Sequence, residues 1–107
     1  MTSTVKYQNN LRTECTHLAS TSTIHTDAPI DNNGKGELFS PTDLVATALA
    51  SCMITVMGIK AEQTNIQFTQ VKALVKKVMA NDPRRISMIQ VQLEVRDSRS
   101  EEHTSEL

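Results

Sequence analysis

Hydrophobic and polar positions divide the chain into an alternating beginning, a continuous apolar centre and an alternating end. Between Leu44 and Ile59 no charged residue occurs, and small or apolar side chains fill most positions. Ser40 suits the N-cap of a helix, Pro41 its first helical position and Asp43 the acidic position of a capping box. The pattern predicts a long helix that is apolar on every face, and we expect a sheet or a second subunit to cover most of it.

The same stretch is shorter than the about 20 apolar residues that a bilayer-spanning helix needs. It also contains three hydroxylated residues and one glycine, Thr47, Ser51, Thr55 and Gly58. We therefore expect a buried helix of a soluble protein and no membrane partner.

Three strands are expected before the helix. Residues 3–9 and 11–19 are predicted as strands on either side of a tight turn at Asn9-Asn10, and residues 23–26 as a third. Residues 27–39 contain a proline, two glycines and an Asp-Asn-Asn run, which predicts a loop.

Two longer strands are expected after the helix. Over residues 66–79 apolar and polar residues alternate, and residues 89–95 repeat this period of two beyond a turn at Asn81-Asp82-Pro83. The pattern is typical of a β-hairpin with one buried face. The order β-β-β-α-β-β predicts an α+β fold, in which an antiparallel sheet packs on the long central helix.

The composition limits the classes of function. The 107 residues fit one domain, and 38% of them are hydrophobic, which suffices for a core. The net charge of -1 leaves no basic surplus to neutralise phosphates, so we expect no nucleic-acid partner. Two distant cysteines form neither a disulfide framework nor a four-ligand zinc pattern, and the N-terminus does not resemble a secretory signal. We expect a cytoplasmic protein with reduced thiols, no metal and no cofactor.

The segment from Arg99 to Leu107 breaks the patterns that precede it. Its string resembles the in-frame translation of a widely used DNA sequencing adapter at every position. We therefore expect residues 1–98 to be an incomplete domain and residues 99–107 to be a non-native tail, outside the fold and the function.

Cys52 is the main candidate for chemistry because it lies in the middle of the apolar stretch. Buried cysteines most often fill space, and the dipole of the helix N-terminus fades within one turn, well before Cys52. A reactive Cys52 needs a neighbouring cation, because only the thiolate attacks. From the residues alone, core filling and reactivity both stay open.

Other candidate sites are weaker. Cys15 and His17 share one face of a predicted strand, but two ligands are too few for a metal site. Gly34-Lys35-Gly36 lacks the spacing of a phosphate-binding loop. We therefore expect a packing role for Cys15 and no ligand at the glycines.

Several segments together resemble the OsmC/Ohr family, the osmotically inducible protein C and organic hydroperoxide resistance proteins. The most specific is Ser-Pro-Thr-Asp-Leu at residues 40–44, followed by a run of small residues that ends at Cys52. The strands around LRTECTHLAS, the loop before the helix and the hairpin ANDPRRISMIQVQLEV are similar too, so the resemblance covers nearly all of residues 3–97. It implies an OsmC-like homodimer in which the sheets of both subunits wrap the cysteine helix.

The resemblance also implies roles for single residues. Cys52 matches the cysteine that reacts with peroxide, and Arg12 matches the arginine that activates it. Thr42 stands where well-studied members carry the glutamate that orients this arginine, so Asp43 either takes that role or only caps the helix. The family's second cysteine, which resolves the oxidised first one, lies in a later Cys-Pro helix, and Cys15 does not match it. We expect this chain to lack that helix and its resolving cysteine, and the full-length protein to be the enzyme.

The implied function is reduction of organic hydroperoxides or hydrogen peroxide in oxidative-stress defence, through a sulfenic acid on Cys52. The expected partners are a second copy of the chain, a small hydroperoxide and an external thiol or dithiol reductant. An alternative from another class is a non-catalytic homodimer of the same fold that binds a small apolar ligand. A third possibility is that the incomplete chain does not fold alone.

Overall fold

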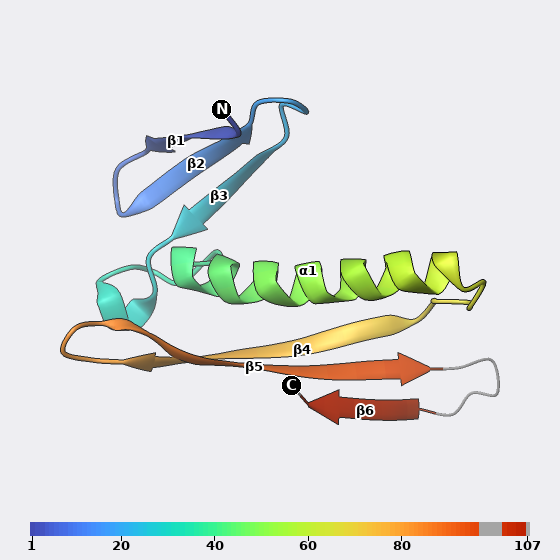
Figure 1. The fold of residues 1–107 in the computed structure, drawn as a ribbon. Helices are drawn as coiled ribbons and strands as arrows, with labels where there is room; N and C mark the ends of the chain where they lie inside the picture. The colour runs from blue at the N-terminus through green and yellow to red at the C-terminus, as the bar shows by residue number, and fades with distance from the viewer. Residues whose placement is uncertain (97–101, 107) are drawn as a thin grey trace. The chain divides into compact units, whose positions relative to one another are not determined.

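The computed structural model describes residues 1–96 and 102–106. The fold is α+β, with antiparallel sheets and one long helix, which confirms the predicted class. The chain forms two compact units, Met1–Leu44 and Val45–Leu107, whose elements are labelled in Figure 1.

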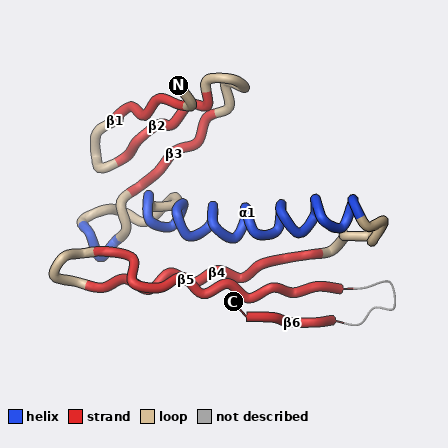
Figure 2. Tube along the Cα trace, viewed as in Figure 1, coloured by secondary structure: helices blue, strands red, loops and turns tan. Residues whose placement is uncertain are grey.

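The first unit is built on a three-stranded antiparallel sheet in the order β1-β2-β3. Its strands are β1 (Ser3–Tyr7), β2 (Arg12–His17) and β3 (Thr23–Asp27), and the short 3-10 helix η1 (Ile30–Asn32) follows them (Figure 2). All three predicted strands are present, although each differs from its predicted range by one or two residues at one or both ends.

The turn between β1 and β2 sets the place where β2 begins. Asn9, Asn10 and Leu11 have φ values of 69°, 54° and 61°, in the left-handed region that asparagine tolerates best. The turn closes when the Arg12 N–H donates to the Asn9 carbonyl at 3.1 Å and the Gln8 N–H donates to the Arg12 carbonyl at 2.9 Å. Leu11 therefore belongs to the turn, contrary to prediction, and Arg12 is the first residue of β2.

The helix α1 (Pro41–Gln63) begins at the residue that the sequence predicts. The Ser40 N–H donates to Asp43 Oδ2 at 2.9 Å, and the Asp43 N–H donates to Ser40 Oγ at 3.1 Å. These reciprocal bonds form a capping box, which satisfies amide groups that the first helical turn leaves open. The predicted cap is confirmed.

In the second unit, α1 packs on a second antiparallel sheet with the order β4-β5-β6. The strands are β4 (Val71–Ala80), β5 (Arg85–Arg96) and β6 (Glu102–Glu106), and Figure 1 shows α1 lying along β4 and β5. The fully buried core contains Ala50 of α1 and Val91 and Leu93 of β5. Six partly buried residues surround it: Met53, Ile54, Met57, Ala73, Val75 and Ile89.

The predicted one-sided hairpin is confirmed in β4 and β5. Over the first part of β4, half-buried and exposed residues alternate, with Val71, Ala73 and Val75 against Lys72, Leu74 and Lys76. The alternation ends near a β-bulge between Val78 and Met79, where the register with β5 shifts. The first of these strands also begins later than predicted, at Val71 rather than residue 66.

The sheet of the second unit covers one side of α1, and the buried residues of the helix are Ala46, Ala50 and Ala61. We expected cover on most sides by a sheet or a second subunit, and the share of a second subunit stays a prediction. The residues that we call the outer face of α1 are all exposed and recur at alternating steps of four and three: Val45, Leu49, Cys52, Val56 and Ile59. Because a sheet covers one face of a helix, the sheet of the second unit leaves the outer face of α1 uncovered.

The helix is also longer than the uncharged stretch within it. By length and composition, α1 is long and apolar enough to cross a membrane. The core helix of a folded protein passes the same test, and the packing of α1 on β4 and β5 agrees with that interpretation. The expected absence of a membrane partner stays a prediction.

Strand β6 lies in the segment that we expected to be a non-native tail. Its backbone pairs antiparallel with β5, from Gln92 opposite Glu106 to Arg96 opposite Glu102. Residues 102–106 therefore join the sheet, contrary to our exclusion of them from the fold. Strand pairing uses only backbone groups, so the non-native origin of the tail stays a prediction, and its junction at residues 97–101 lies outside the described residues.

Candidate functional site

Cys52 lies on the outer face of α1, where it is exposed. Leu49 precedes it and Val56 follows it along the same apolar stripe. The helix positions that pack against the sheet are others, among them Ala50 and Met53. Cys52 therefore does not fill the core of its own unit, and its sulfur is open to a small molecule.

A pocket of about 440 Å³ lies toward the C-terminal end of α1. Four of its lining residues come from the helix and two from the segment after it: Thr55, Gly58, Ile59, Glu62, Ile66 and Phe68. It includes Ile59 of the outer face, so the apolar stripe that carries Cys52 runs into it. Its size and mixed lining suit a small and mostly apolar ligand.

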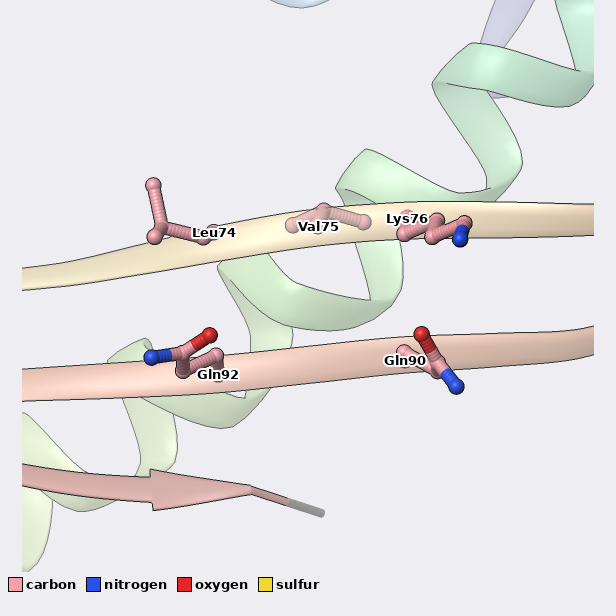
Figure 3. Close-up of a pocket in the computed structure, with 5 residues that line it drawn as sticks. All are labelled: Leu74, Val75, Lys76, Gln90 and Gln92. Atoms are coloured by element: carbon pink, nitrogen blue, oxygen red, sulfur yellow. The ribbon is translucent and has the colours of Figure 1, made fainter.

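A smaller pocket of about 170 Å³ lies on the sheet β4-β5. Figure 3 shows its lining, with Leu74, Val75 and Lys76 on β4 and Gln90 and Gln92 on β5. These five side chains include no thiol, carboxylate or imidazole. Its polar groups are the Lys76 amine and the two glutamine amides, which can form hydrogen bonds.

Arg12 forms a charged cluster with two carboxylates inside the first unit. The register of β2 and β3 places Arg12 directly opposite Asp27. Arg12 Nη2 lies 3.4 Å from Asp27 Oδ2 and also donates to Glu37 Oε1. The side chain of Asp27 is 0% exposed, that of Arg12 34% and that of Glu37 59%. The cluster thus extends from a buried carboxylate to an exposed one.

The loop after β3 brings Glu37 to this cluster. Its backbone turns tightly, because Gly36 has a φ of +64° and a side chain at Gly34 would collide with the Ala28 carbonyl. The Glu37 N–H then donates to Asp27 Oδ2 at 3.1 Å. The glycines therefore serve the closure of the loop, and the Asp27 carboxylate joins the loop to the sheet.

Asp43 is the third candidate residue, and its carboxylate takes part in the capping box with Ser40. This geometry supports the cap, and its role toward Arg12 stays a prediction. Cys15 is half-buried on β2, where its Sγ lies 3.9 Å from Thr13 Oγ1. Among the residues that the structure describes, no three His, Cys, Asp or Glu side chains are grouped to hold a metal ion.

Arg12 and Cys52 belong to different units, so the activation of Cys52 by Arg12 stays a prediction. What the structure brings together is Arg12 with Asp27 and Glu37. Neither carboxylate was predicted from the sequence. Asp27 was detectable in principle, because a hairpin with its turn centred near residues 19–20 pairs residue 12 with residue 27. The Ser/Thr-rich sequence between β2 and β3 did not show where the turn is centred, and no pattern predicted that Glu37 lies beside Arg12.

The fold and these residues define a class of α+β proteins with a cysteine on one long helix that packs on an antiparallel sheet. The family model described as OsmC-like protein matches residues 34–107, and the chain belongs to this family. The expected family membership is thereby confirmed.

The chain is also similar to a crystal structure from Psychrobacter arcticus 273-4, described as that of a candidate osmotic stress induced and detoxification response protein. The two share 51% sequence identity with a TM-score of 0.85, over 94% of this chain and 75% of that one. No curated protein matches the chain. The family and this neighbour support a general role connected with oxidative stress.

Proposed function

We propose that this chain is a cysteine-based peroxidase that reduces organic hydroperoxides or hydrogen peroxide in oxidative-stress defence. Membership of the OsmC family and the stress and detoxification description of the neighbour support the proposal. The observation that carries it is the position of Cys52 on the exposed outer face of α1. A cysteine that serves only to pack the core is expected on the opposite face of α1, among Ala50, Met53 and Met57.

The proposed chemistry begins with Cys52 as a thiolate, held in that form by the guanidinium of Arg12. The sulfur donates an electron pair to the distal oxygen of the peroxide, so that an S–O bond forms as the O–O bond breaks. The proximal oxygen leaves with the bonding pair and takes up a proton, which yields an alcohol, or water from hydrogen peroxide. Cys52 is thereby oxidised to a sulfenic acid.

An external thiol completes the cycle. Its thiolate attacks the sulfenic sulfur, water leaves, and a mixed disulfide forms on Cys52. A second thiol then attacks that disulfide and releases Cys52 in its reduced form. We propose a dithiol as the natural reductant, a cytoplasmic location, and a homodimer whose second copy covers the outer face of α1. No cofactor takes part.

A single-turnover experiment tests the proposal. The reduced chain is mixed with cumene hydroperoxide in the presence of dimedone, and mass spectrometry then locates the trapped sulfenic acid. We expect dimedone on Cys52, none in Cys52→Ser, and normal labelling of Cys52 in the matched control Cys15→Ser. Equal peroxide consumption by the wild-type chain and Cys52→Ser would rule out the proposal.

The pocket at the end of α1 favours a second candidate function, a non-catalytic carrier of small apolar ligands. Its volume of about 440 Å³ lies in the usual range for small-molecule sites. A fluorescent apolar probe should then bind the wild-type chain and Cys52→Ser equally, and Ile66→Ser more weakly. Probe binding of this kind, together with no sulfenic acid on Cys52, would favour the carrier over the peroxidase.

A further inference from the structure

We propose that Asp27 positions Arg12 for its action on Cys52, and that Glu37 opposes this action by holding the same guanidinium. The inference rests on the proposed peroxidase function and adds two residues to it. It assigns the carboxylate that orients the arginine to β3, whereas the sequence pointed to the start of α1.

The placement of Asp27 suits a positioning role. It faces Arg12 across the ladder between β2 and β3, and its own N–H donates to the Phe39 carbonyl at 3.1 Å. Its Oδ2 accepts both the Glu37 N–H and Arg12 Nη2. The Asp27 carboxylate is therefore fixed by its backbone and its loop, and provides a rigid point for a flexible side chain.

The burial of Asp27 points to a function rather than to stability alone. Its side chain is 0% exposed, and among the described residues Oδ1 is a buried side-chain oxygen without a hydrogen-bond partner. A buried carboxylate with one unpaired oxygen is unfavourable, and an apolar pair would serve stability as well. Such a group needs an explanation, and orienting a guanidinium provides one.

Glu37 differs from Asp27 in exposure and in its expected effect. Its carboxylate is mostly solvent-exposed and contacts the same Nη2 atom of Arg12. The formal charges of Arg12, Asp27 and Glu37 sum to one negative charge, so the cluster disfavours a further anion such as a thiolate. The exposed contact is the weaker of the two because water screens it, and its release frees the cation. Loss of Glu37 removes only this opposing charge, whereas loss of Asp27 also removes the group that orients Arg12. The two changes should therefore act on the reaction in opposite directions.

The first test compares two charge-removing variants of the full chain. The rate of sulfenic acid formation on Cys52 is measured with cumene hydroperoxide, and far-ultraviolet circular dichroism checks folding. We expect Asp27→Asn to slow the reaction about tenfold, the size of a lost charge-assisted hydrogen bond, and Glu37→Gln to speed it about twofold. Glu14→Gln is the matched control, because Glu14 lies on β2 but contacts Gln8 and His25, and its rate should not change.

Each outcome of this test decides something. An unchanged rate in Asp27→Asn would overturn the positioning role, and an unchanged or slower rate in Glu37→Gln would overturn the opposing role. The Asp27→Asn change is also made in an Arg12→Met background, where it should have no further effect. A second loss of similar size there would show that Asp27 acts through something other than Arg12.

An NMR measurement keeps the proposal testable if Asp27→Asn does not fold or if Cys52 proves unreactive. The Arg12 Nε–H signal, assigned by its loss in Arg12→Lys, reports how freely the guanidinium rotates. We expect hindered rotation in the wild-type chain and in Glu37→Gln, because Asp27 still holds the group. Free rotation in either would overturn the positioning role even if the peroxidase proposal holds. Hindered rotation with no sulfenic acid on Cys52 would instead contradict the peroxidase function alone.

Discussion

The Arg12 cluster and the outer face of α1 differ in how completely this chain provides their surroundings. Arg12 has both of its carboxylate partners within the first unit, and the buried one is also held by a backbone N–H. The sheet of the second unit does not cover the outer face of α1, and a row of large apolar side chains around Cys52 is exposed.

The difference follows from the physics of the two kinds of group. A buried charge without a partner is strongly unfavourable, so the chain must provide its counter-charge wherever it folds. An exposed apolar face lowers stability little by itself, and a contiguous one marks a surface that another molecule covers. The charged half of the proposed chemistry therefore has its partners within the first unit, whereas for the half that carries the sulfur we propose a second copy of the chain as cover.

The largest expected effect is a difference in stability between variants on the two sides of α1. Leu93→Ala removes a buried side chain that packs with Ala50 and Val91, and we expect it to lower the free energy of unfolding by about 3 kcal/mol. Leu49→Ala truncates an exposed side chain on the outer face, and at low protein concentration we expect a loss below about 0.5 kcal/mol. Urea unfolding followed by circular dichroism measures both.

The same pair of variants tests the cover that we propose for the outer face. If a second copy covers it, the loss from Leu49→Ala should grow with protein concentration, because association stabilises the folded chain by mass action. The loss from Leu93→Ala should then stay nearly constant. Equal losses from both variants in dilute solution would contradict the difference between the two faces.

The next effect concerns Arg12. Replacing it in Arg12→Met should slow sulfenic acid formation on Cys52 about a hundredfold, the usual size for loss of one group that stabilises developing or resident negative charge. Arg12→Lys is the matched control, because lysine keeps the positive charge but lacks the planar guanidinium. Its rate should fall between those of the wild type and Arg12→Met. The single-turnover rate with cumene hydroperoxide is the measurement. A rate in Arg12→Met within error of the wild type would show that Arg12 does not activate Cys52.

The fold was predictable where one local pattern decides it. Hydrophobic alternation predicted β4 and β5 because one face of that hairpin is buried, and Ser40 with Asp43 predicted the start of α1 because a capping box is a local arrangement. Element ends were less predictable. Leu11 lies in the turn and not in the predicted strand, because the turn contains three residues with left-handed φ values. No pattern in the sequence predicted the bulge after Val78.

The candidate site was predictable only in part. Cys52 stood out by its place in the apolar stretch, whereas its reactivity and the role of Arg12 came from a resemblance that marks single positions. The structure leaves the pairing of Cys52 with Arg12 as a prediction. Asp27 and Glu37 were missed because their place beside Arg12 depends on strand register and on the closure of a ten-residue stretch, Ala28 to Glu37, neither of which is local. The exposure of Cys52 was also missed, because an all-apolar helix does not reveal which face a single sheet leaves open.

The smallest effect concerns the junction where α1 begins. Ser40→Ala removes the hydroxyl that accepts the Asp43 N–H, and we expect a loss of about 1 kcal/mol in the free energy of unfolding. Ser51→Ala is the matched control, since Ser51 is exposed in the middle of α1, where alanine favours the helix slightly. If Asp43 only caps the helix, Asp43→Asn should also lower stability and leave the reaction of Cys52 with peroxide unaltered. A different result would assign the orienting role to Asp43 rather than to Asp27. In that case Asp43→Asn and Arg12→Met would slow the reaction equally, and the double variant would be no slower than either.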